Sequence, residues 1–407
     1  METASRRADW NRTVAGWALY DFANTMFSMN IVSRYFPLWV TGEHGAPDIY
    51  FSVSLSLSMF LVAITSPALG AISDDTGQRV KPLFYLTAGC VLATALIGFS
   101  PTLMAGLVLF ALANYCYQSA LVFYDGLLPD VTGSGSIAKV SGYGVALGYV
   151  GAIAGLGLIA PVESAFGPNA VYFPTAVLFM LSAVPCFLWV KDKNPAPFAR
   201  ADIAGAFKTL LTSFKMVKER RDLFLFLAAN FLILDGVNTV IAFMSIYANT
   251  VIGLSGGRLN VFLITSTVGA AVGSFIWGTI THKAGARRAM IYVCWMWLAT
   301  LVLAAFSTGE TIFWAVGPMA GVALGGVWVA GRVMLVNLAP SSAIGECFGL
   351  YSVAGKAASI TGPLVWGVVV YVFSFLGGTI QHRLAVLSLA IFIGGGLWLI
   401  RKITPTG

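Results

Sequence analysis

Twelve apolar runs fill most of this 407-residue chain, and each is long enough to cross a lipid bilayer as a helix. A membrane-spanning helix needs about 20 mostly apolar residues, and the runs lack the period-two alternation of membrane strands. Only 10% of the residues are charged, against roughly 25% in soluble domains. We therefore predict an all-α polytopic membrane protein with helices near residues 14–40, 50–73, 82–100, 102–127, 138–161, 170–190, 222–250, 259–281, 288–307, 310–338, 347–374 and 381–400.

The positive charges indicate how these helices are oriented. With a cytoplasmic N-terminus, nineteen of the 24 Lys and Arg residues fall in the two tails or in the even-numbered loops. The positive-inside rule then predicts that both termini are cytoplasmic. The first apolar run is too long for a signal peptide and lacks a small-residue cleavage pattern, so we expect it to remain. An integral protein of a bacterial inner (plasma) membrane is expected, with lipid headgroups rather than nucleic acid as the partner of its basic charge.

Short motifs recur in the two halves of the chain. Asp-x-x-Asn-Thr occurs at residues 21–25 and again at 235–239, and G-x-x-x-[D/H]-x-x-G-x-R occurs at 70–79 and again at 278–287. Gly142 and Gly148 are matched with Gly349 and Gly355. Parallel six-helix repeats of this kind are known in transporters. We predict an N-terminal six-helix bundle (1–190), a cytoplasmic linker (191–221) and a C-terminal six-helix bundle (222–407), with an amphipathic helix near 208–221.

Polar residues inside two of the predicted helices need an explanation. A charge at mid-bilayer costs about 2.5–3.5 kcal/mol on insertion scales. In each of the two helices, the helical spacing places the polar residues on one face. We expect this face to line a central cavity and to supply proton or amine sites. The predicted sets are Asp21, Asn24 and Thr25 in the first helix and Asp235, Asn238 and Thr239 in the seventh. The alternative is that the acids belong to structural ion pairs between helices.

Cations inside the C-terminal half complement these acids. Arg332 follows Trp328 by one turn, and Lys356 lies in the eleventh helix. The guanidinium of Arg332 presents a planar fork suited to a carboxylate or phosphate, and the ammonium of Lys356 presents a point charge. Both cations are therefore candidate anion sites, with Trp328 as a cavity wall. Asn114 and Gln118 share a face of the fourth helix and bond either substrate or each other. The combination favours a zwitterion, such as an amino acid, or an anion moved with protons. Carboxylates are the expected proton carriers, because no His is expected deep in a helix.

Several stretches resemble known families. The loop between the second and third helices, G-x-x-x-D-x-x-G-x-R-x-K, resembles the signature loop of the major facilitator superfamily. The stretches WALYDFAN (17–24), FYDGLLPD (123–130) and FGLYSVAGKAASITGP (348–363) resemble the vacuole effluxer-like family of autophagy-related permeases. The resemblance implies the twelve-helix major facilitator fold, secondary transport by alternating access, and amino acids as the favoured cargo.

The resemblance also implies a gate on the cytoplasmic side. In the superfamily, an acid at the end of the fourth helix commonly joins the charges of the signature loop. We therefore predict that Asp74, Arg79 and Asp125 form a latch that stabilises the outward-open state. Gly70 and Gly77 are expected to let helices and loop approach closely. The remaining predicted gating positions are Gly70 and Gly77 in the first copy and Gly278, Gly285 and Arg287 in the second.

Other classes of function remain open. Within transport, the cargo could be a sugar, a muropeptide, a lysolipid or a drug, and a non-transporting receptor or scaffold is the rival class. The sequence has no phosphate-cradling glycine loop with Lys, no arguable Ser-His-Asp set, and no metal-ligand or disulfide spacing among its Cys and His. We predict a protein that is not an enzyme and uses no cofactor or metal. We expect a monomer with a small-molecule substrate, H⁺ as the coupling ion and lipids around it.

Overall fold

The computed structural model describes residues 11–132, 137–193, 195–197, 202–340, 343–377 and 379–404. Within these ranges the regular secondary structure is entirely helical. Eleven of the described helical segments are long and apolar enough to span a membrane, and the interrupted helical segment over residues 12–43 is a twelfth. The predicted all-helical membrane fold with twelve helices is confirmed.

The first repeat begins with an interrupted helix. α2 (Arg12–Phe27) continues through a π-helical stretch (Ser28–Tyr35), α3 (Phe36–Leu38) and a second π-helical stretch (Trp39–Glu43). Pro37 has no N–H to give to the preceding turn, which explains why regular α-helical bonding is lost here. The repeat then contains α4 (Asp48–Thr76), α5 (Val80–Ile97), α6 (Leu103–Thr132), α7 (Ile137–Phe166) and α8 (Tyr172–Trp189).

The second repeat follows the linker helix α9 (Ile203–Glu219), which forms close to the predicted amphipathic helix. α10 (Arg221–Tyr247), like α2, passes into a π-helical turn (Ala248–Ile252). α14 (Ile344–Ala357) and α15 (Thr361–Val372) together cover the predicted eleventh helix, which is interrupted at residues 358–360. The other helices are α11 (Gly256–Ala284), α12 (Ala286–Phe306), α13 (Glu310–Leu338) and α16 (Ile380–Arg401).

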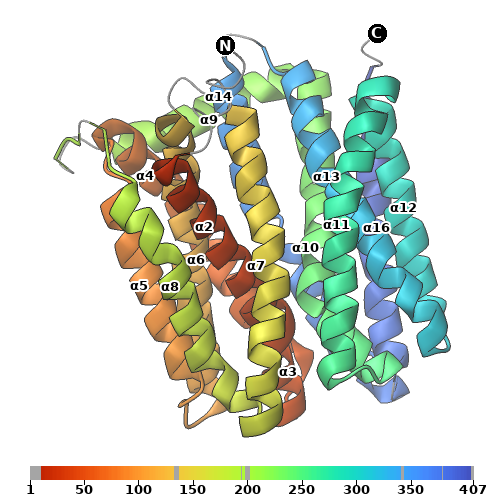
Figure 1. Ribbon diagram of the computed structural model, residues 1–407. Coiled ribbons are helices and arrows are strands. Elements are labelled where there is room, and N and C mark those ends of the chain that lie inside the picture. Colours follow the sequence, from red (N-terminus) through yellow and green to blue (C-terminus); the bar gives the residue numbers. More distant parts are fainter. Residues whose placement is uncertain are drawn as a thin grey trace, which may run out of the picture. The chain divides into compact units, whose positions relative to one another are not determined.

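The contacts divide the chain into two compact units. Unit 1 covers Met1–Trp39 and Leu57–Lys208, and unit 2 covers Val40–Ser56 and Thr209–Gly407. Within each unit, long helices lie side by side (Figure 1). The first turns of α4 therefore group with the second repeat. The predicted boundaries at 190 and 222 had placed this segment in the N-terminal bundle.

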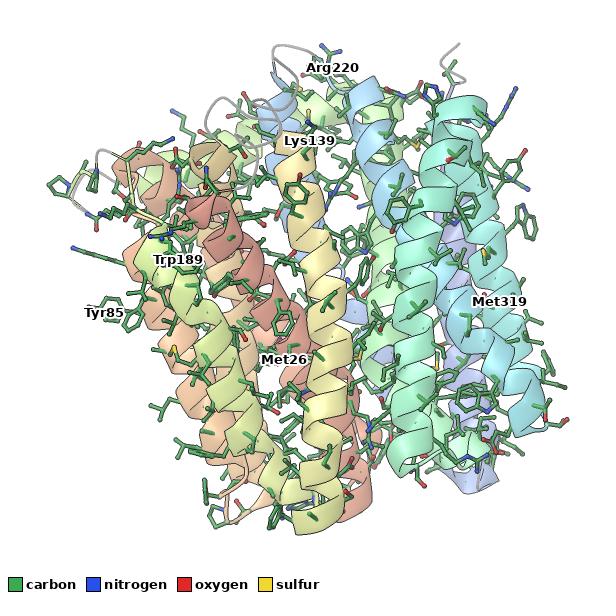
Figure 2. The ribbon with its side chains drawn as sticks, viewed as in Figure 1. Met26, Tyr85, Lys139, Trp189, Arg220 and Met319 are labelled. Carbon is green, nitrogen blue, oxygen red and sulfur yellow. The ribbon has the colours of Figure 1, made fainter. Side chains whose placement is uncertain are left out.

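Large apolar side chains cover the outer faces of the helices. Tyr85 on α5 is 71% exposed, and Figure 2 shows it pointing away from the neighbouring helices. Phe275 on α11 and Ile391 on α16 are exposed to a similar degree. Continuous exposed apolar surface of this kind marks a contact with lipid or a partner. It matches a protein whose solvent is the bilayer.

Glycines set the distance between helices inside unit 1. A Cβ added to Gly151 on α7 would overlap the backbone of Phe22 on α2, and one added to Gly155 would overlap Met26. Small residues at four-residue spacing permit this close backbone approach in membranes. α2 and α7 therefore pack almost backbone to backbone, and this contact positions the polar residues of α2.

Candidate functional site

The first acidic position lies where α2 meets the glycine face of α7. A Cβ on Gly148 would come within 2.7 Å of Thr25 Oγ1 and 3.5 Å of Asp21 Oδ2, and a Cβ on Gly144 would lie 3.1 Å from the same carboxylate oxygen. Thr25 Oγ1 donates to the backbone carbonyl of Asp21 at 3.0 Å. The carboxylate is half-buried, so α7 holds it inside unit 1 instead of leaving it to lipid.

Next to it, Asn24 is an unusual buried amide. Its side chain is 2% exposed, and neither its Oδ1 nor its Nδ2 has a hydrogen-bond partner within the described part of the chain. The hydroxyls of Ser119 and Tyr124 on α6 share this condition. Each buried polar group left without a partner costs about 1–3 kcal/mol. The fold accepts that cost around Asn24.

The second acidic position lies in unit 2 at an interruption in a membrane helix. Asp235 on α10 is fully buried, and its Oδ1 accepts a hydrogen bond of 2.7 Å from the backbone N–H of Gly362 in the first turn of α15. Its other oxygen, Oδ2, has no hydrogen-bond partner among the described residues. A helix N-terminus carries free N–H groups and favours an anion. Asp235 therefore caps α15 from a neighbouring helix.

Pro363 explains why the helix is interrupted there. Its ring clashes with the carbonyl four residues earlier, and it has no N–H to donate. That carbonyl belongs to Ser359, inside the interruption at residues 358–360. Asn238 Nδ2 donates to Ser359 Oγ at 2.9 Å, and Thr239 Oγ1 donates to the Asp235 carbonyl at 2.6 Å. The structure thus brings Asp235 and Asn238 together at this interruption, with Thr239 beside them.

The two acidic positions are built alike. Gly148 faces Thr25 and Asp21 in unit 1, and Gly362 faces Thr239 and Asp235 in unit 2. Both glycines and both acids are separated by the same 214 residues along the sequence. The match of Gly148 with Gly355 is therefore wrong by seven residues. Two helical turns carry nearly the same face, so glycine spacing alone could not fix the register.

The predicted cations are more exposed than the fully buried Asp235. Lys356 is half-buried in the last turn of α14, next to the interruption. Trp328 and Arg332 lie one turn apart on α13, and both are exposed. On α6, Asn114 is buried and donates to Ser58 Oγ on α4 at 2.7 Å, while Gln118 is half-buried. Asn114 thus bonds a neighbouring helix.

The predicted latch contains an acid that sequence reasoning missed. Arg79 forms ion pairs with Asp130 at 2.5 Å and with Asp74 at 3.5 Å. The backbone N–H groups of Arg79 and Val80 both donate to Asp192 Oδ1, which caps the start of α5. Asp130 directly follows Pro129 at the end of the fourth apolar run. This position was the one sequence feature from which Asp130 could have been predicted as a partner of Arg79.

Asp125, the acid named from the sequence, lies five residues earlier on α6 and is exposed. Positions five apart on an α-helix do not share a face. The ion pair of Arg79 with Asp130 therefore involves a different face of α6 from the one that carries Asp125. The part of Asp125 in the latch stays a prediction.

The second copy of the loop motif uses its arginine differently. Gly77 and Gly285 both adopt positive φ, at 62° and 84°, where glycine is favoured. Arg287 donates to the carbonyls of Ile400 and Arg401 at the end of α16. The motif therefore marks a glycine turn followed by an arginine. In the first copy that arginine pairs with acids, and in the second it binds carbonyls at a helix end.

The other two glycines of the motif do not permit a close approach. A Cβ on Gly70 or on Gly278 would meet nothing within 4 Å. The close approach expected at Gly70 is therefore wrong within the described part of the chain.

A buried cation in α2 also has a partner far along the chain. Arg34, in the π-helical stretch, is 2% exposed and contacts both carboxylate oxygens of Glu163 on α7, at 3.1 and 3.2 Å. The sequence shows both residues but gives no spacing that would pair them. This ion pair makes a second fixed point between α2 and α7.

The family model described as vacuole effluxer Atg22-like matches residues 49–404. The chain belongs to the vacuole effluxer Atg22-like family. An uncharacterized MFS-type transporter of Bacillus subtilis, YxiO, is 28% identical over 372 residues, which cover 86% of this chain and 87% of that protein. Autophagy-related protein 22-1 of Neosartorya fischeri is 24% identical over 286 residues, or 63% of this chain and 46% of that protein.

Solved structures extend the comparison of this Atg22-like chain to its fold. The D323A mutant of the nucleoside transporter NupG superposes with a TM-score of 0.81 at 13% identity, covering 97% of this chain and all of the other. An inward-facing bacterial homologue of the lysosomal transporter Spinster gives a TM-score of 0.68 at 14% identity, covering 97% and 98%. These identities speak for the fold alone. The Atg22-like chain is a membrane transporter of the major facilitator fold.

Proposed function

We propose that this transporter is a secondary active carrier of a small polar solute, with an amino acid or a similar zwitterion or anion as cargo and H⁺ as the coupling ion. Alternating access, in which one repeat moves relative to the other, is how carriers of this fold work in general. The observation that supports the proposal is the pair of membrane-embedded acids, Asp21 and Asp235, each set against a glycine of its own repeat.

The interrupted helix supports a binding role for the second acid. Interrupted membrane helices expose backbone groups, and transporters use such half-helix ends to hold polar substrates and coupling ions. Asp235 faces the start of α15 and retains one carboxylate oxygen without a protein partner. That oxygen can accept a proton or a bond from an ammonium group, whereas a purely structural cap would need only Oδ1.

The cargo is proposed from charge. A carboxylate recognises an ammonium group, and a nearby cation recognises a carboxylate. Lys356 lies in the last turn of α14, two residues before the interruption beside Asp235, so unit 2 offers both signs of charge near one interruption. We assign substrate contact to Asp21 with Asn24, proton carriage to Asp235, and anion contact to Lys356 with Arg332.

Purified protein in proteoliposomes tests the assignment. A thermal-shift screen of metabolites at two pH values would select the cargo, and counterflow of that cargo would then be measured with and without a pH gradient. Asp235→Asn should keep counterflow and lose the response to the gradient, because an amide still accepts from Gly362 but cannot titrate. Asp21→Asn should reduce counterflow by about tenfold or more, equivalent to roughly 1.4 kcal/mol of binding.

Asp75→Asn serves as the matched control, because Asp75 is exposed and its carboxylate accepts a hydrogen bond from the backbone N–H of Asp202. It should leave both readouts unchanged. A wild-type protein that binds a metabolite but never exchanges it would favour the receptor or scaffold class. Equal loss in Asp75→Asn and Asp21→Asn would overturn the assignment of the site.

A further inference from the structure

A second buried acid in unit 2 pairs with a histidine. Asp48, the first residue of α4, is 5% exposed, and His382, in the first turn of α16, is 4% exposed. His382 Nε2 lies 3.4 Å from Asp48 Oδ2, and the same oxygen accepts a 2.8 Å hydrogen bond from Trp366 Nε1 on α15. His382 is only the third residue of α16, so it does not lie deep in a helix, but its side chain is buried all the same.

The imidazole of His382 can accept one proton. Neither ring nitrogen of His382 makes a hydrogen bond within the described residues. With a neutral imidazole the buried pair carries one negative charge. A proton on the ring converts the pair to an imidazolium beside a carboxylate, with no net charge. Burial disfavours net charge, and imidazole is the side chain that changes charge near physiological pH.

Other charged or titratable groups at this end of unit 2 are engaged elsewhere. The Arg383 guanidinium donates to the Ala305 carbonyl, and the Tyr247 hydroxyl donates to the Ala304 carbonyl. Arg258 and Glu310, at the starts of α11 and α13, pair with each other. Within the described residues, the carboxylate of Asp48 is thus the ionic partner of His382.

A stripe of serines connects this pair to the interrupted helix. Asp48, Ser52 and Ser56 recur every four residues along α4 and are all buried. A Cβ on Gly367 of α15 would overlap Ser52 Oγ, and Ser56 Oγ donates to the Ile360 carbonyl at 2.8 Å. The first turns of α4 therefore hold α15 at Trp366, at Gly367 and at its interrupted start.

α15 also links the pair to Asp235. Gly362, which donates to Asp235, and Trp366, which donates to Asp48, are four residues apart on α15. One helical turn rises about 5.4 Å, so neighbouring turns of the same short helix contact both acids. His382 and Trp366 both contact Asp48 Oδ2, so a proton on His382 draws that oxygen toward the imidazolium, weakens the Trp366 bond and changes the hold of α4 on α15.

We propose that Asp48 and His382 form a proton-binding site of unit 2, at the end of the unit where α16 begins, and that its occupancy controls how α4 holds α15. The proposal rests on the proton coupling of the proposed function, which it deepens by naming a second site. The ligand is a proton. The site lies one turn of α15 away from the acid assigned above as the proton carrier.

Trp366 is a built-in reporter of this site. Its ring centroid lies 6.3 Å from that of His382, and a protonated imidazole quenches indole fluorescence more strongly than a neutral one. The fluorescence of purified full-length protein would be recorded from about pH 5 to 8, where an imidazole changes charge. Subtracting the spectrum of Trp366→Phe isolates the reporter from the other tryptophans.

The difference signal should fall on acidification in the wild type and should stay constant in His382→Gln. Asp48→Asn should change the wild-type response, because the imidazolium loses the opposite charge that stabilises it. His44→Gln, which changes an exposed histidine just before α4, should keep the wild-type response. A pH-dependent signal that survives in His382→Gln, or its absence from the wild type, would overturn the site.

Transport gives the second readout. His382→Gln should weaken the response of flux to a pH gradient, whereas His44→Gln should retain it. Where His382→Gln does not fold, Asp48→Asn carries the fluorescence test alone. A wild-type fluorescence change without any solute flux would support the proton site and refute the proposed transport function. Flux that follows the gradient equally in His382→Gln and wild type would overturn the control of α4 by this site.

Discussion

Gly362→Ala is the substitution with the sharpest structural consequence. A Cβ at this position would overlap Thr239 Oγ1 and would lie 2.7 Å from the Asp235 carbonyl and 2.9 Å from Asp235 Oδ1. The threonine hydroxyl can rotate, but the backbone carbonyl of α10 cannot move away alone. α10 and α15 must therefore separate, and the bond from the Gly362 N–H to Asp235 must lengthen.

The size of the effect follows from two costs. Overpacking a close contact costs about 1–3 kcal/mol, and weakening the hydrogen bond from Gly362 to the buried Asp235 carboxylate adds about 1–3 kcal/mol. We expect a total loss of roughly 2–6 kcal/mol, measured as a clear drop in the thermal unfolding temperature of the purified protein. Gly349→Ala on α14 is the control, because its Cβ would meet nothing within 4 Å.

The control should be neutral or slightly stabilising, since Ala favours helix over Gly by about 0.5–1 kcal/mol. Adding Thr239→Ala to Gly362→Ala should recover part of the loss, because it removes one of the two obstacles. Equal stability of Gly362→Ala and Gly349→Ala would refute the close contact between α10 and α15. Full recovery in the double variant would show that the backbone contact carries none of the cost.

Two further predictions concern the charged contacts of unit 1. Arg79→Ala and Asp130→Asn should be non-additive, with a coupling of about 0.5–3 kcal/mol in a double-mutant cycle of thermal stability, and additive losses would contradict the ion pair. Glu163→Leu should cost about 3–5 kcal/mol because it removes the carboxylate that neutralises the buried Arg34. The double variant with Arg34→Met should restore folded protein in the membrane, and failure to do so would argue against charge as the cause.

The helices were predictable because their cause is local. Runs of about 20 apolar residues suffice to define a membrane span, and eleven of the described helical segments meet this description directly. The loop motif was equally local, since Gly77 and Gly285 adopt the positive φ that only glycine accepts readily. The interruption before α15 was also within reach, because Pro363 is a helix breaker printed in the sequence.

The pairings were not predictable in the same way. Asp130 and Arg79, or Glu163 and Arg34, meet only after distant helices pack. His382 illustrates the limit most clearly. Its position at the start of an apolar run suggested a loop, and only the packing of α4 and α15 against α16 buries it beside Asp48. Sequence spacing orders residues along one helix but carries no information on which helices touch.

Proton movement driven by solute is the most direct measurement of the central claim. Proteoliposomes would hold a pH-sensitive dye, and an amino-acid mixture would be added outside without any imposed pH gradient. The account predicts a solute-dependent change in internal pH in the wild type and its loss in Asp235→Asn, which keeps the bond from Gly362 but cannot carry a proton. Solute entry with no movement of protons in the wild type, or an unchanged proton signal in Asp235→Asn, would contradict it.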